Sequence, residues 1–507
     1  MSDPTPAPFL DRRYGWVNPA LALLSSALLI VIFPPFGATW FAPLALTPLL
    51  MACALEPNWT KRALLGWLAG VVFWCGLCPW IQFVLEVHGD MGPFLSWFGF
   101  LLFGLYKGLA TALFAALAGL CMNRWWTIPA TAALWIGIER LHVYTGFTWL
   151  QLGNAATTMP LPMRIAPFTG VYGISFALAM LSAAVAVVLL RRPRRELAWL
   201  LTFAVLIFLP RAPRPATGSR QALVVQPNVD PEMRWTRDTL DLTEHKLALL
   251  SKQPGADLIV WPEVPAPFYI DDARYQNYLK QVARDGQAPF LSGVVGYTPD
   301  RMPLNSAVMV APDGNIVGRY DKIYLVPFGE FIPPLFSWVN RITQESGDFS
   351  AGNRVVVFPV NDPRTGEAHK AGGFICYESA VPNLVREFTN SGAEVLLNLS
   401  NDGYFGHSAA HEQHLLIARM RAAENRRWLI RATNDGITVS IDPAGRIAAR
   451  LKPFEQTAGM LPFDYSNEQT PYTRYGDWFA WSCLGVGLAL SAGSLLVVKS
   501  RGSVDSR

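Results

Sequence analysis

Apolar and polar positions divide this chain of 507 residues into two kinds of segment. Long apolar runs lie near residues 19–33, 40–55, 63–85, 93–120, 127–142, 166–190, 196–210 and 478–498. Several of these runs reach the roughly 20 residues with which an α-helix crosses the hydrocarbon core of a bilayer. The pattern predicts a multi-pass helical membrane domain with about eight spans, of which the second, fifth and seventh are the shortest.

The stretch between the last two runs has the pattern of a mixed α/β domain. Runs typical of strands lie at 222–226, 257–261, 290–297, 306–311, 316–320, 371–378 and 394–398, and helical spacing is found within 236–253, 272–285, 381–390 and 408–425. Two turn sequences, Pro312-Asp313-Gly314 and Asp442 to Gly445, predict hairpins. This mixture predicts a layered α/β sandwich. We therefore expect membrane helices in 1–210, a polar domain in 211–477, and a last span with a tail in 478–507.

The distribution of charge supports this division. Asp, Glu, Lys and Arg make up 16% of the chain, against about 25% in an average soluble protein. Between Tyr14 and Pro210 there are only 15 such residues. The net charge of +4 is small, and no run of Lys and Arg with interleaved aromatic residues indicates a nucleic-acid partner.

Positive residues beside the apolar runs predict the orientation, because Lys and Arg are enriched in cytoplasmic loops. They precede the first run, follow every second run and follow the last one: Arg12, Arg13, Lys61, Arg62, Arg124, Arg191, Arg192, Arg194, Arg195, Lys499, Arg501 and Arg507. This predicts an inner-membrane protein with both termini in the cytoplasm and residues 211–477 outside the inner membrane. The prediction requires an odd number of spans before residue 211.

Charged residues inside the predicted spans are also candidates for function. Lys107 lies midway along the fourth run, and Glu139-Arg140 lies at the end of the fifth. The alternative is structural: an ion pair that packs helices, or an arginine that reaches for the membrane interface.

Three polar stretches each begin where a predicted strand ends, which is where open α/β sheets place catalytic groups. They are Trp261-Pro262-Glu263, 320–330 and 373–379. The third contains Cys376, the only one of six cysteines that lies outside an apolar run. A lone thiol cannot form a disulfide within this domain.

Together the three stretches contain the groups for covalent acyl transfer. The Cys376 thiol reacts as a thiolate, so it needs a base and a positive neighbour. Glu263 can take the proton, while Lys322 and the backbone N–H of Tyr377 can stabilise the tetrahedral oxyanion. Lys322 can also stabilise the thiolate. A helix that begins near Pro382 places Cys376 at a turn like that of a nucleophile elbow.

The order Glu…Lys…Cys with these flanking residues resembles the nitrilase, or carbon–nitrogen hydrolase, superfamily. Together with the eight spans it resembles the membrane branch of that superfamily, the apolipoprotein N-acyltransferase family, over essentially the whole chain. The matching stretches are Thr145–Trp149, Gly170–Ser175, Gln226–Asn228, Trp235, Trp261–Glu263, Lys322–Glu330, Cys376–Glu378, Asn401-Asp402 with Phe405-Gly406, and Gln413–Ala422. The chain departs from the family pattern at Thr148, Tyr404 and 407–411. These departures are expected to affect the preference for the acyl chain or the acceptor, and not the reaction itself.

The resemblance implies a nitrilase-like αββα sandwich in residues 211–477 and a role for each catalytic residue. Glu263 is implied as the general base, Lys322 as the stabiliser of thiolate and oxyanion, and Cys376 as the acylated nucleophile. Glu330 is implied to support the lysine and the proton relay.

A second group of residues is implied to support the reaction or contact the substrate. Trp235, Tyr377 and Glu378 match positions that the family needs for activity. Tyr404 stands where the family usually has tryptophan, and Trp149 is a candidate for lining a lipid site.

The implied reaction is a ping-pong transfer through a thioester. An acyl chain leaves a phospholipid, typically phosphatidylethanolamine, for Cys376. The α-amino group of a diacylglyceryl-modified N-terminal cysteine of an apolipoprotein then takes it, which gives a triacylated lipoprotein. No cofactor and no metal are implied, and we expect a monomer. The apolar loop at 331–338 is expected to gate the site from the bilayer or to pack on the domain core.

Three other interpretations fit parts of the sequence. A membrane-tethered amidohydrolase of the nitrilase type uses the same residues, with water as the final acceptor of a small amide. A catalytically inactive domain that binds lipoproteins is the second. The third is a metal site at His407, His411 and His414, but their spacing is one residue short of H-E-x-x-H, so helix capping and packing are the expected roles.

Overall fold

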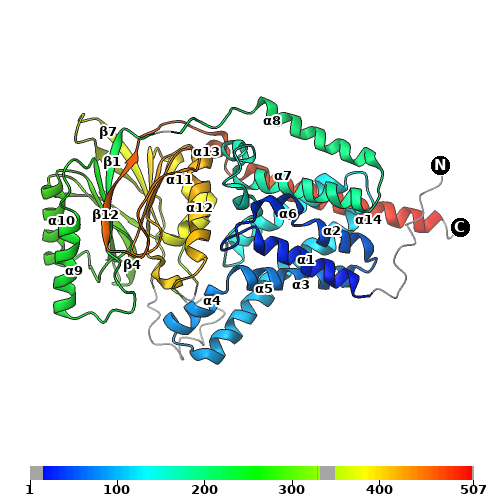
Figure 1. The fold of residues 1–507 in the computed structure, drawn as a ribbon, viewed down its shortest axis with the longest axis horizontal. Helices are drawn as coiled ribbons and strands as arrows, with labels where there is room; N and C mark the ends of the chain where they lie inside the picture. The colour runs from blue at the N-terminus through cyan, green and yellow to red at the C-terminus, as the bar shows by residue number, and fades with distance from the viewer. Residues whose placement is uncertain (1–14, 216, 328, 332–348, 505–507) are drawn as a thin grey trace.

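The computed structural model describes residues 15–504 except residues 216, 328 and 332–348. A bundle of apolar helices and a domain with two β-sheets lie end to end along the long axis of the molecule (Figure 1). The last helix, α14 (Trp478–Val504), returns from the sheets through the bundle to its far end (Figure 1). The sheet domain is thus attached to the bundle at both of its ends.

The bundle consists of the helices that precede the sheets, together with α14. These are α1 (Val17–Val31), η2 (Thr39–Leu44), α2 (Thr47–Leu55), α3 (Trp59–Leu77), α4 (Trp80–Phe83), η3 (Val84–His88), α5 (Gly92–Cys121), α6 (Thr127–Leu141), η4 (His142–Tyr144), η5 (Leu152–Ala156), η6 (Pro162–Arg164), α7 (Ala166–Leu189), η7 (Arg194–Ala204) and α8 (Val205–Phe208).

Only some of the predicted spans are long helices. Among the described residues, α5, α7 and α14 are each long and apolar enough to cross a membrane. Helix α3 and the segment of α4 and η3 give a fourth candidate if they count together, and they meet at a bend of 63°. The first, second and fifth predicted spans correspond to the shorter segments α1, η2 with α2, and α6.

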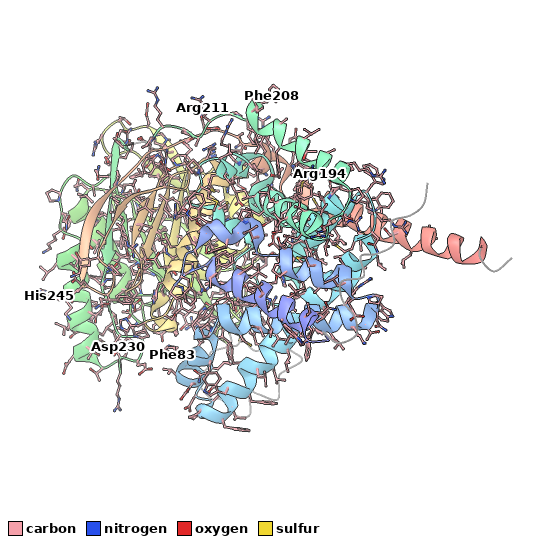
Figure 2. The ribbon with its side chains drawn as sticks, turned by 45° about the vertical axis from the view of Figure 1, so that its right-hand side comes forward. Phe83, Arg194, Phe208, Arg211, Asp230 and His245 are labelled. Atoms are coloured by element: carbon pink, nitrogen blue, oxygen red, sulfur yellow. The ribbon has the colours of Figure 1, made fainter. Side chains whose placement is uncertain are left out.

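The seventh predicted span, at 196–210, has an unusual conformation. Residues Arg194–Ala204 form a 3₁₀ helix of 11 residues, which continues into the four residues of α8. Figure 2 labels Arg194 and Phe208 near the two ends of this segment, which runs along the outside of the bundle. Long 3₁₀ runs are uncommon, and this one rises more per residue than an α-helix.

The sheet domain has the layered architecture that the sequence predicts. Its two six-stranded sheets have the orders β12-β1-β2-β3-β4-β5 and β11-β10-β9-β8-β7-β6. Antiparallel pairs β4–β5 and β10–β11 enclose the two predicted hairpin turns. The strands are β1 (Arg220–Gln226), β2 (Leu258–Val260), β3 (Phe290–Tyr297), β4 (Pro303–Val310), β5 (Ile316–Asp321), β6 (Val357–Asn361), β7 (Ala368–Ile375), β8 (Val395–Ser400), β9 (Leu429–Thr433), β10 (Val439–Ile441), β11 (Ile447–Arg450) and β12 (Thr457–Phe463).

Helices cover the outer face of each sheet, so the central strands are buried on both sides. In β1, Ala222 and Val224 belong to the core between the sheets, whereas Leu223 and Val225 pack under α9 (Arg237–Leu250) and α10 (Ala273–Gly286). This double burial explains why β1 reads as a continuous apolar run.

Helices α11 (Pro382–Asn390), α12 (Ala410–Asn425) and α13 (Pro471–Tyr475) lie between the second sheet and the bundle (Figure 1). Helix α12 packs against α7. Arg140 pairs with Asp477 just before α14, at 2.7 Å between Nε and Oδ2, whereas Glu139 accepts hydrogen bonds from Trp135 and Leu152. The second sheet and its helices therefore form the surface that meets the bundle.

Candidate active site

Glu263 follows one strand, Lys322 and Glu330 belong to the stretch that follows another, and the three side chains lie in one largely buried cluster. Lys322 Nζ donates to Glu263 Oε1 at 3.2 Å and to Glu330 Oε1 at 2.8 Å. The Asn305 side-chain amide donates to the same two oxygens, at 2.8 and 2.7 Å. Lys322 is only 1% exposed. The ammonium balances one of the two negative charges, and the amide helps to orient both carboxylates.

The backbone at the ends of the strands holds these side chains in place. Glu263 follows β2, and its Oε2 accepts the backbone N–H of Asn401 at 2.8 Å. Lys322 follows β5, and its own N–H donates to Asn305 O on the neighbouring strand β4 at 2.8 Å. Glu330 Oε2 accepts the N–H of Val326 at 2.8 Å. Fixed backbone groups therefore preorganise the cluster.

Cys376 lies at a sharp turn from β7 into the 3₁₀ helix η9 (Cys376–Ala380), and α11 begins at Pro382. Its φ is +49°, in the left-handed region that residues other than glycine rarely adopt. Backbone strain of this kind concentrates at functional positions. The residue is 7% exposed. The turn has the strand–turn–helix form expected of a nucleophile elbow.

The charges around the site set the resting protonation of the thiol. Burial and then the Glu263 carboxylate raise the pKa of the Cys376 thiol, and Lys322 opposes them only in part. Burial acts to lower the pKa of Lys322, but the carboxylates of Glu263 and Glu330 hold it well above its ordinary value. The site therefore rests as a neutral thiol near a charged lysine. The thiolate must form by proton transfer to a base during attack.

This resting state predicts the pH dependence of thiol alkylation. The thiolate fraction grows tenfold per pH unit below the pKa, and a raised pKa places the plateau above the tested range. We expect alkylation of Cys376 by iodoacetamide to accelerate about tenfold per unit between pH 7 and 9. Peptide mass spectrometry at timed intervals measures the rate. A plateau below pH 8 would show a preformed thiolate instead.

Glu378 connects the nucleophile turn to the lysine segment. Its Oε2 accepts the N–H of Ile375, the residue before the nucleophile, at 2.8 Å. Its Oε1 accepts the Tyr320 hydroxyl and the N–H of Ile323, both at 2.7 Å. Because Ile323 directly follows Lys322, one buried carboxylate fixes the distance between the two strand ends.

Tyr377 rests on a loop of the helix bundle. Its hydroxyl accepts the backbone N–H of Thr148 at 2.8 Å. Its ring stacks on Phe147, with centroids 5.8 Å apart, and on Trp149, at 6.4 Å. The residue that follows the nucleophile is thus in direct contact with the bundle.

Gln413, at the start of α12, joins three further parts of the bundle to the catalytic domain. Its Oε1 accepts the indole N–H of Trp149 at 2.8 Å and that of Trp80 at 3.3 Å. Its Nε2 donates to Pro34 O at 3.0 Å and to Leu77 O at 2.9 Å. These four bonds use the full capacity of a primary amide, so Gln413 fixes α12 against the bundle.

Two of the predicted supporting residues lie outside this buried group. Tyr404, in η10 (Asp402–Phe405), is 46% exposed and faces His88 of η3 at a ring distance of 4.7 Å. Trp235 is 36% exposed, and in the described part of the chain no hydrogen bond or ring contact joins it to Cys376. Residues 332–338 of the predicted gating loop lie outside the described residues.

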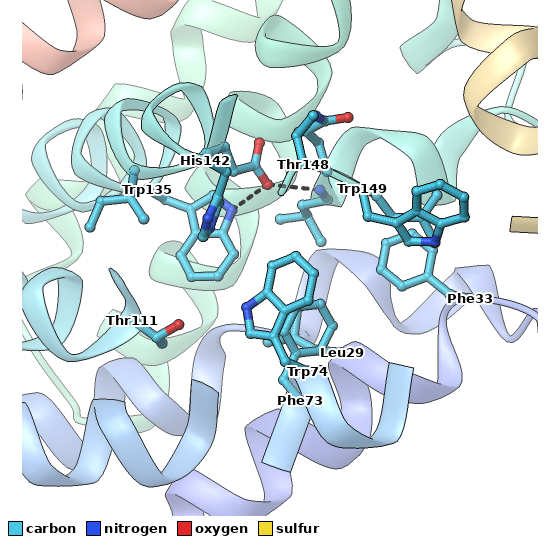
Figure 3. Close-up of a pocket in the computed structure, with 14 residues that line it drawn as sticks. Leu29, Phe33, Phe73, Trp74, Thr111, Trp135, His142, Thr148 and Trp149 are labelled. Atoms are coloured by element: carbon cyan, nitrogen blue, oxygen red, sulfur yellow. Dashed lines mark hydrogen bonds between the residues drawn. The ribbon is translucent and has the colours of Figure 1, made fainter. Parts of the chain in front are cut away.

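A small cavity lies in the bundle near the loop that contacts Tyr377 (Figure 3). It encloses about 20 Å³, and its lining includes Thr148 and Trp149. Glu139 Oε1 accepts the indole N–H of Trp135 at 2.8 Å and the N–H of Leu152 at 2.7 Å (Figure 3). The cavity has room for about one water molecule, so it is no acyl-chain pocket. Glu139 holds the loop in place.

Several residues of the site did not stand out in the sequence. Asn305 is the clearest case, because it lies in the largely apolar strand β4 (Pro303–Val310) and orients both carboxylates. A polar side chain in a strand that is otherwise buried was the available signal. Gln413 and His414 lie in a stretch that matches the family, but the sequence assigned neither of them a catalytic role. His414 packs inside the domain, as expected, and also forms specific hydrogen bonds.

Comparison with known proteins follows the same division of the chain. A family of carbon–nitrogen hydrolases matches residues 222–465, and the apolipoprotein N-acyltransferase N-terminal domain matches residues 25–184. A protein of Geobacter metallireducens named apolipoprotein N-acyltransferase is 33% identical, over 93% of this chain and 94% of that protein. One of the same name from Azotobacter vinelandii is 32% identical, over 96% of each. The structure of Saccharomyces cerevisiae Nit3, a nitrilase superfamily member, aligns with a TM-score of 0.37 and 16% identity, over 49% of this chain and 91% of that one.

The sheet domain therefore belongs to the carbon–nitrogen hydrolase class and is joined to a bundle of apolar helices. Taken as a whole, the chain belongs to the apolipoprotein N-acyltransferase family. It is an acyltransferase, and the family favours this activity over the amidohydrolase alternative.

Proposed function

We propose that this protein transfers an acyl chain from a membrane phospholipid, through a thioester on Cys376, to the α-amino group of the diacylglyceryl-cysteine at the N-terminus of an apolipoprotein. One observation carries the proposal: Tyr377, the neighbour of the thiol, binds Thr148 of the helix bundle directly. A thiol for soluble amides needs no such contact. A thiol for two lipid-anchored substrates must face the bilayer, where the search is two-dimensional.

In the first half-reaction the Cys376 sulfur attacks the ester carbonyl of the phospholipid, and its proton passes to Glu263. Lys322 Nζ and the N–H of Tyr377 stabilise the oxyanion. The C–S bond forms as the C–O bond breaks, and the lysophospholipid alkoxide takes the proton back from Glu263. Glu330 and Asn305 hold the side chains of Lys322 and Glu263 in position during both bond changes.

In the second half-reaction the amine of the acceptor attacks the thioester. Glu263 takes the ammonium proton, the C–N bond forms, and the C–S bond breaks. The Cys376 thiolate then recovers the proton from Glu263, which restores the resting thiol. The low exposure of Cys376 supports a thioester that survives until the amine attacks, because a thioester open to water is lost by hydrolysis.

The supporting residues have distinct proposed tasks. Glu378 positions the two strand ends, and Tyr377 and Trp149 fix the nucleophile turn on the bundle. Tyr404 and Trp235 are partly exposed aromatic residues. We assign them contacts with the lipid or with the acceptor, for which amphipathic rings at a membrane interface are suited.

We further propose eight spans, with the catalytic domain in the periplasm of an inner-membrane protein that acts as a monomer. The seventh span is the one on which this orientation depends. As an α-helix its 12 residues after the charged start, 197–208, would extend only about 18 Å. As 3₁₀ helix followed by α8 they extend about 22 Å, which is nearer to the roughly 30 Å of a hydrocarbon core. The extended conformation of η7 supports an odd number of spans before the domain.

The test supplies purified protein in detergent with phosphatidylethanolamine and a synthetic diacylated lipopeptide. We expect the lipopeptide to gain the mass of one acyl chain as lysophospholipid appears. An N-acetylated lipopeptide is the matched control and should gain nothing, because its amine is blocked. Free fatty acid without acylated peptide would make the protein a phospholipase. Hydrolysis of soluble amides without lipopeptide product would make it an amidohydrolase.

A further inference from the structure

The carbonyl of Cys376 is held by two buried side chains. His414 Nε2 lies 3.2 Å from Cys376 O, and Asn398 Nδ2 donates to the same oxygen at 3.5 Å. Both side chains are fully buried. Their other hydrogen-bond partners include Ser379, Asp402 and Arg431, which lie outside the cluster of Glu263, Lys322 and Glu330.

The direction of this carbonyl determines the direction of the neighbouring N–H. Cys376 C=O and Tyr377 N–H belong to one planar trans peptide, in which the two bonds point in opposite directions. Tyr377 is the first residue after the nucleophile in a short 3₁₀ turn, where N–H groups lack an intrahelical acceptor. Among the described residues it donates no backbone hydrogen bond outside that turn. A donor that fixes Cys376 O therefore aims a free N–H.

His414 is in the protonation state that this task requires. Its Nε2 lies 3.2 Å from Cys376 O, which can only accept, and 2.8 Å from Ser379 Oγ, which can also accept, so Nε2 carries a hydrogen that these two oxygens share. Its Nδ1 lies between Arg431 Nη2 at 2.9 Å and Asp402 Oδ1 at 3.1 Å, and in a neutral ring with hydrogen on Nε2 it accepts from Arg431. Burial and then the Arg431 guanidinium lower the pKa of His414, which keeps the ring neutral.

Arg431 also orients the second donor. Its Nη1 donates to Asn398 Oδ1 at 2.5 Å, so the amide nitrogen of Asn398 turns toward Cys376 O. Its charge is balanced by Asp402, whose Oδ2 accepts from Nη2 at 2.5 Å. Burial acts to raise the pKa of Asp402, but the Arg431 guanidinium holds it well below its ordinary range. The network is therefore an ion pair that orients two neutral donors.

We infer that His414 is a positioning residue for the oxyanion: by holding Cys376 O, it aims the Tyr377 N–H at the place where negative charge develops. The inference rests on the proposed function for the identity of the acyl donor, but its geometry applies to any acyl donor of Cys376. His414 touches no reacting atom in this arrangement. It should matter for steps that pass through a tetrahedral oxyanion and not for other reactions of the thiol.

The test compares two reactions of the same thiol. Acylation passes through an oxyanion, whereas alkylation by iodoacetamide does not. For His414→Leu we expect single-turnover acylation of Cys376 to fall about 10- to 100-fold, below the full effect of losing an oxyanion donor. Alkylation should stay within about twofold of wild type. His414→Gln keeps an N–H donor and should recover much of the acylation rate.

The matched control is His245→Gln on the exposed outer helix α9, labelled in Figure 2, which should match wild type in both reactions. Asn398→Leu removes the other donor to Cys376 O and should show the same selective loss of acylation. If His414→Leu does not fold, the Asn398→Leu variant tests whether donors to Cys376 O are needed for acylation. Equal losses of acylation and alkylation, or an acylation rate unchanged in both leucine variants, would overturn the inference.

Each acylation is measured with labelled phosphatidylethanolamine and with p-nitrophenyl butyrate. If wild type reacts only with the soluble ester, the proposed donor is wrong, yet the variants still test His414 with that ester. If wild type reacts with both and the variants lose acylation and alkylation alike, the proposed function stands and the inference about His414 fails.

Discussion

Cys376→Ser should carry no hydroxylamine-sensitive acyl label after incubation with labelled phospholipid, and its transfer to lipopeptide should fall on the order of 10⁴-fold or more. A serine hydroxyl has a far higher pKa than a thiol, and the Glu263 and Lys322 groups are arranged for the longer and softer sulfur. Neutral hydroxylamine cleaves thioesters but not oxygen esters, so an ester on serine would not be mistaken for the intermediate. Gel fluorography before and after hydroxylamine measures the label.

The matched control is Cys75→Ser, a half-buried cysteine of α3 within the bundle. We expect it to keep the label and the transfer rate of wild type, because Cys376 is the only cysteine of the sheet domain. A hydroxylamine-sensitive label that survives in Cys376→Ser would assign the nucleophile to another residue.

Lys322→Met should reduce acylation of Cys376 by about 10³-fold, with little change in the KM for phospholipid. The lost ammonium stabilises charge that exists only in the transition state, so kcat carries the effect. Removal of one partner from a buried pair also costs about 3–5 kcal/mol of stability, because the carboxylates of Glu263 and Glu330 remain without their cation. Single-turnover acylation and thermal unfolding measure the two effects separately.

Lys252→Met, at an exposed position after α9, is the matched control and should change neither the acylation rate nor the thermal unfolding. A loss of stability in Lys322→Met without a loss of acylation would show that Lys322 is only the structural counterion of the two carboxylates.

Much of the sheet domain could be predicted, because its strands and turns have local causes. The continuous apolar run of β1 reflects burial on both faces, and the Pro312-Asp313-Gly314 turn joins β4 to β5 as expected. The membrane part was harder to predict. Hydropathy indicates where an apolar segment lies, but not that Arg194–Ala204 is a 3₁₀ helix or that α3 and the segment of α4 and η3 meet at a bend of 63°.

The candidate site shows the same limit. Glu263, Lys322 and Cys376 could be selected because each follows a strand, and sheet topology brings strand ends together. The donors that orient them could not. Asn305 and His414 each form hydrogen bonds to residues that are distant in the chain. The direction of such a bond depends on the folded structure and cannot be deduced from a single sequence.

The sequence by itself determined which chemical groups this protein has and in which kind of surroundings: a thiol, a carboxylate and a lysine in a polar domain between apolar helices. Local patterns of polarity are sufficient for that, because burial and strand periodicity act over a few residues. Only the tertiary structure decided that the resting thiol is protonated, that its turn is seated on the bundle through Thr148 and Gln413, and that Arg431 orients the groups behind it. Those properties depend on distances between parts of the chain that meet only when it folds.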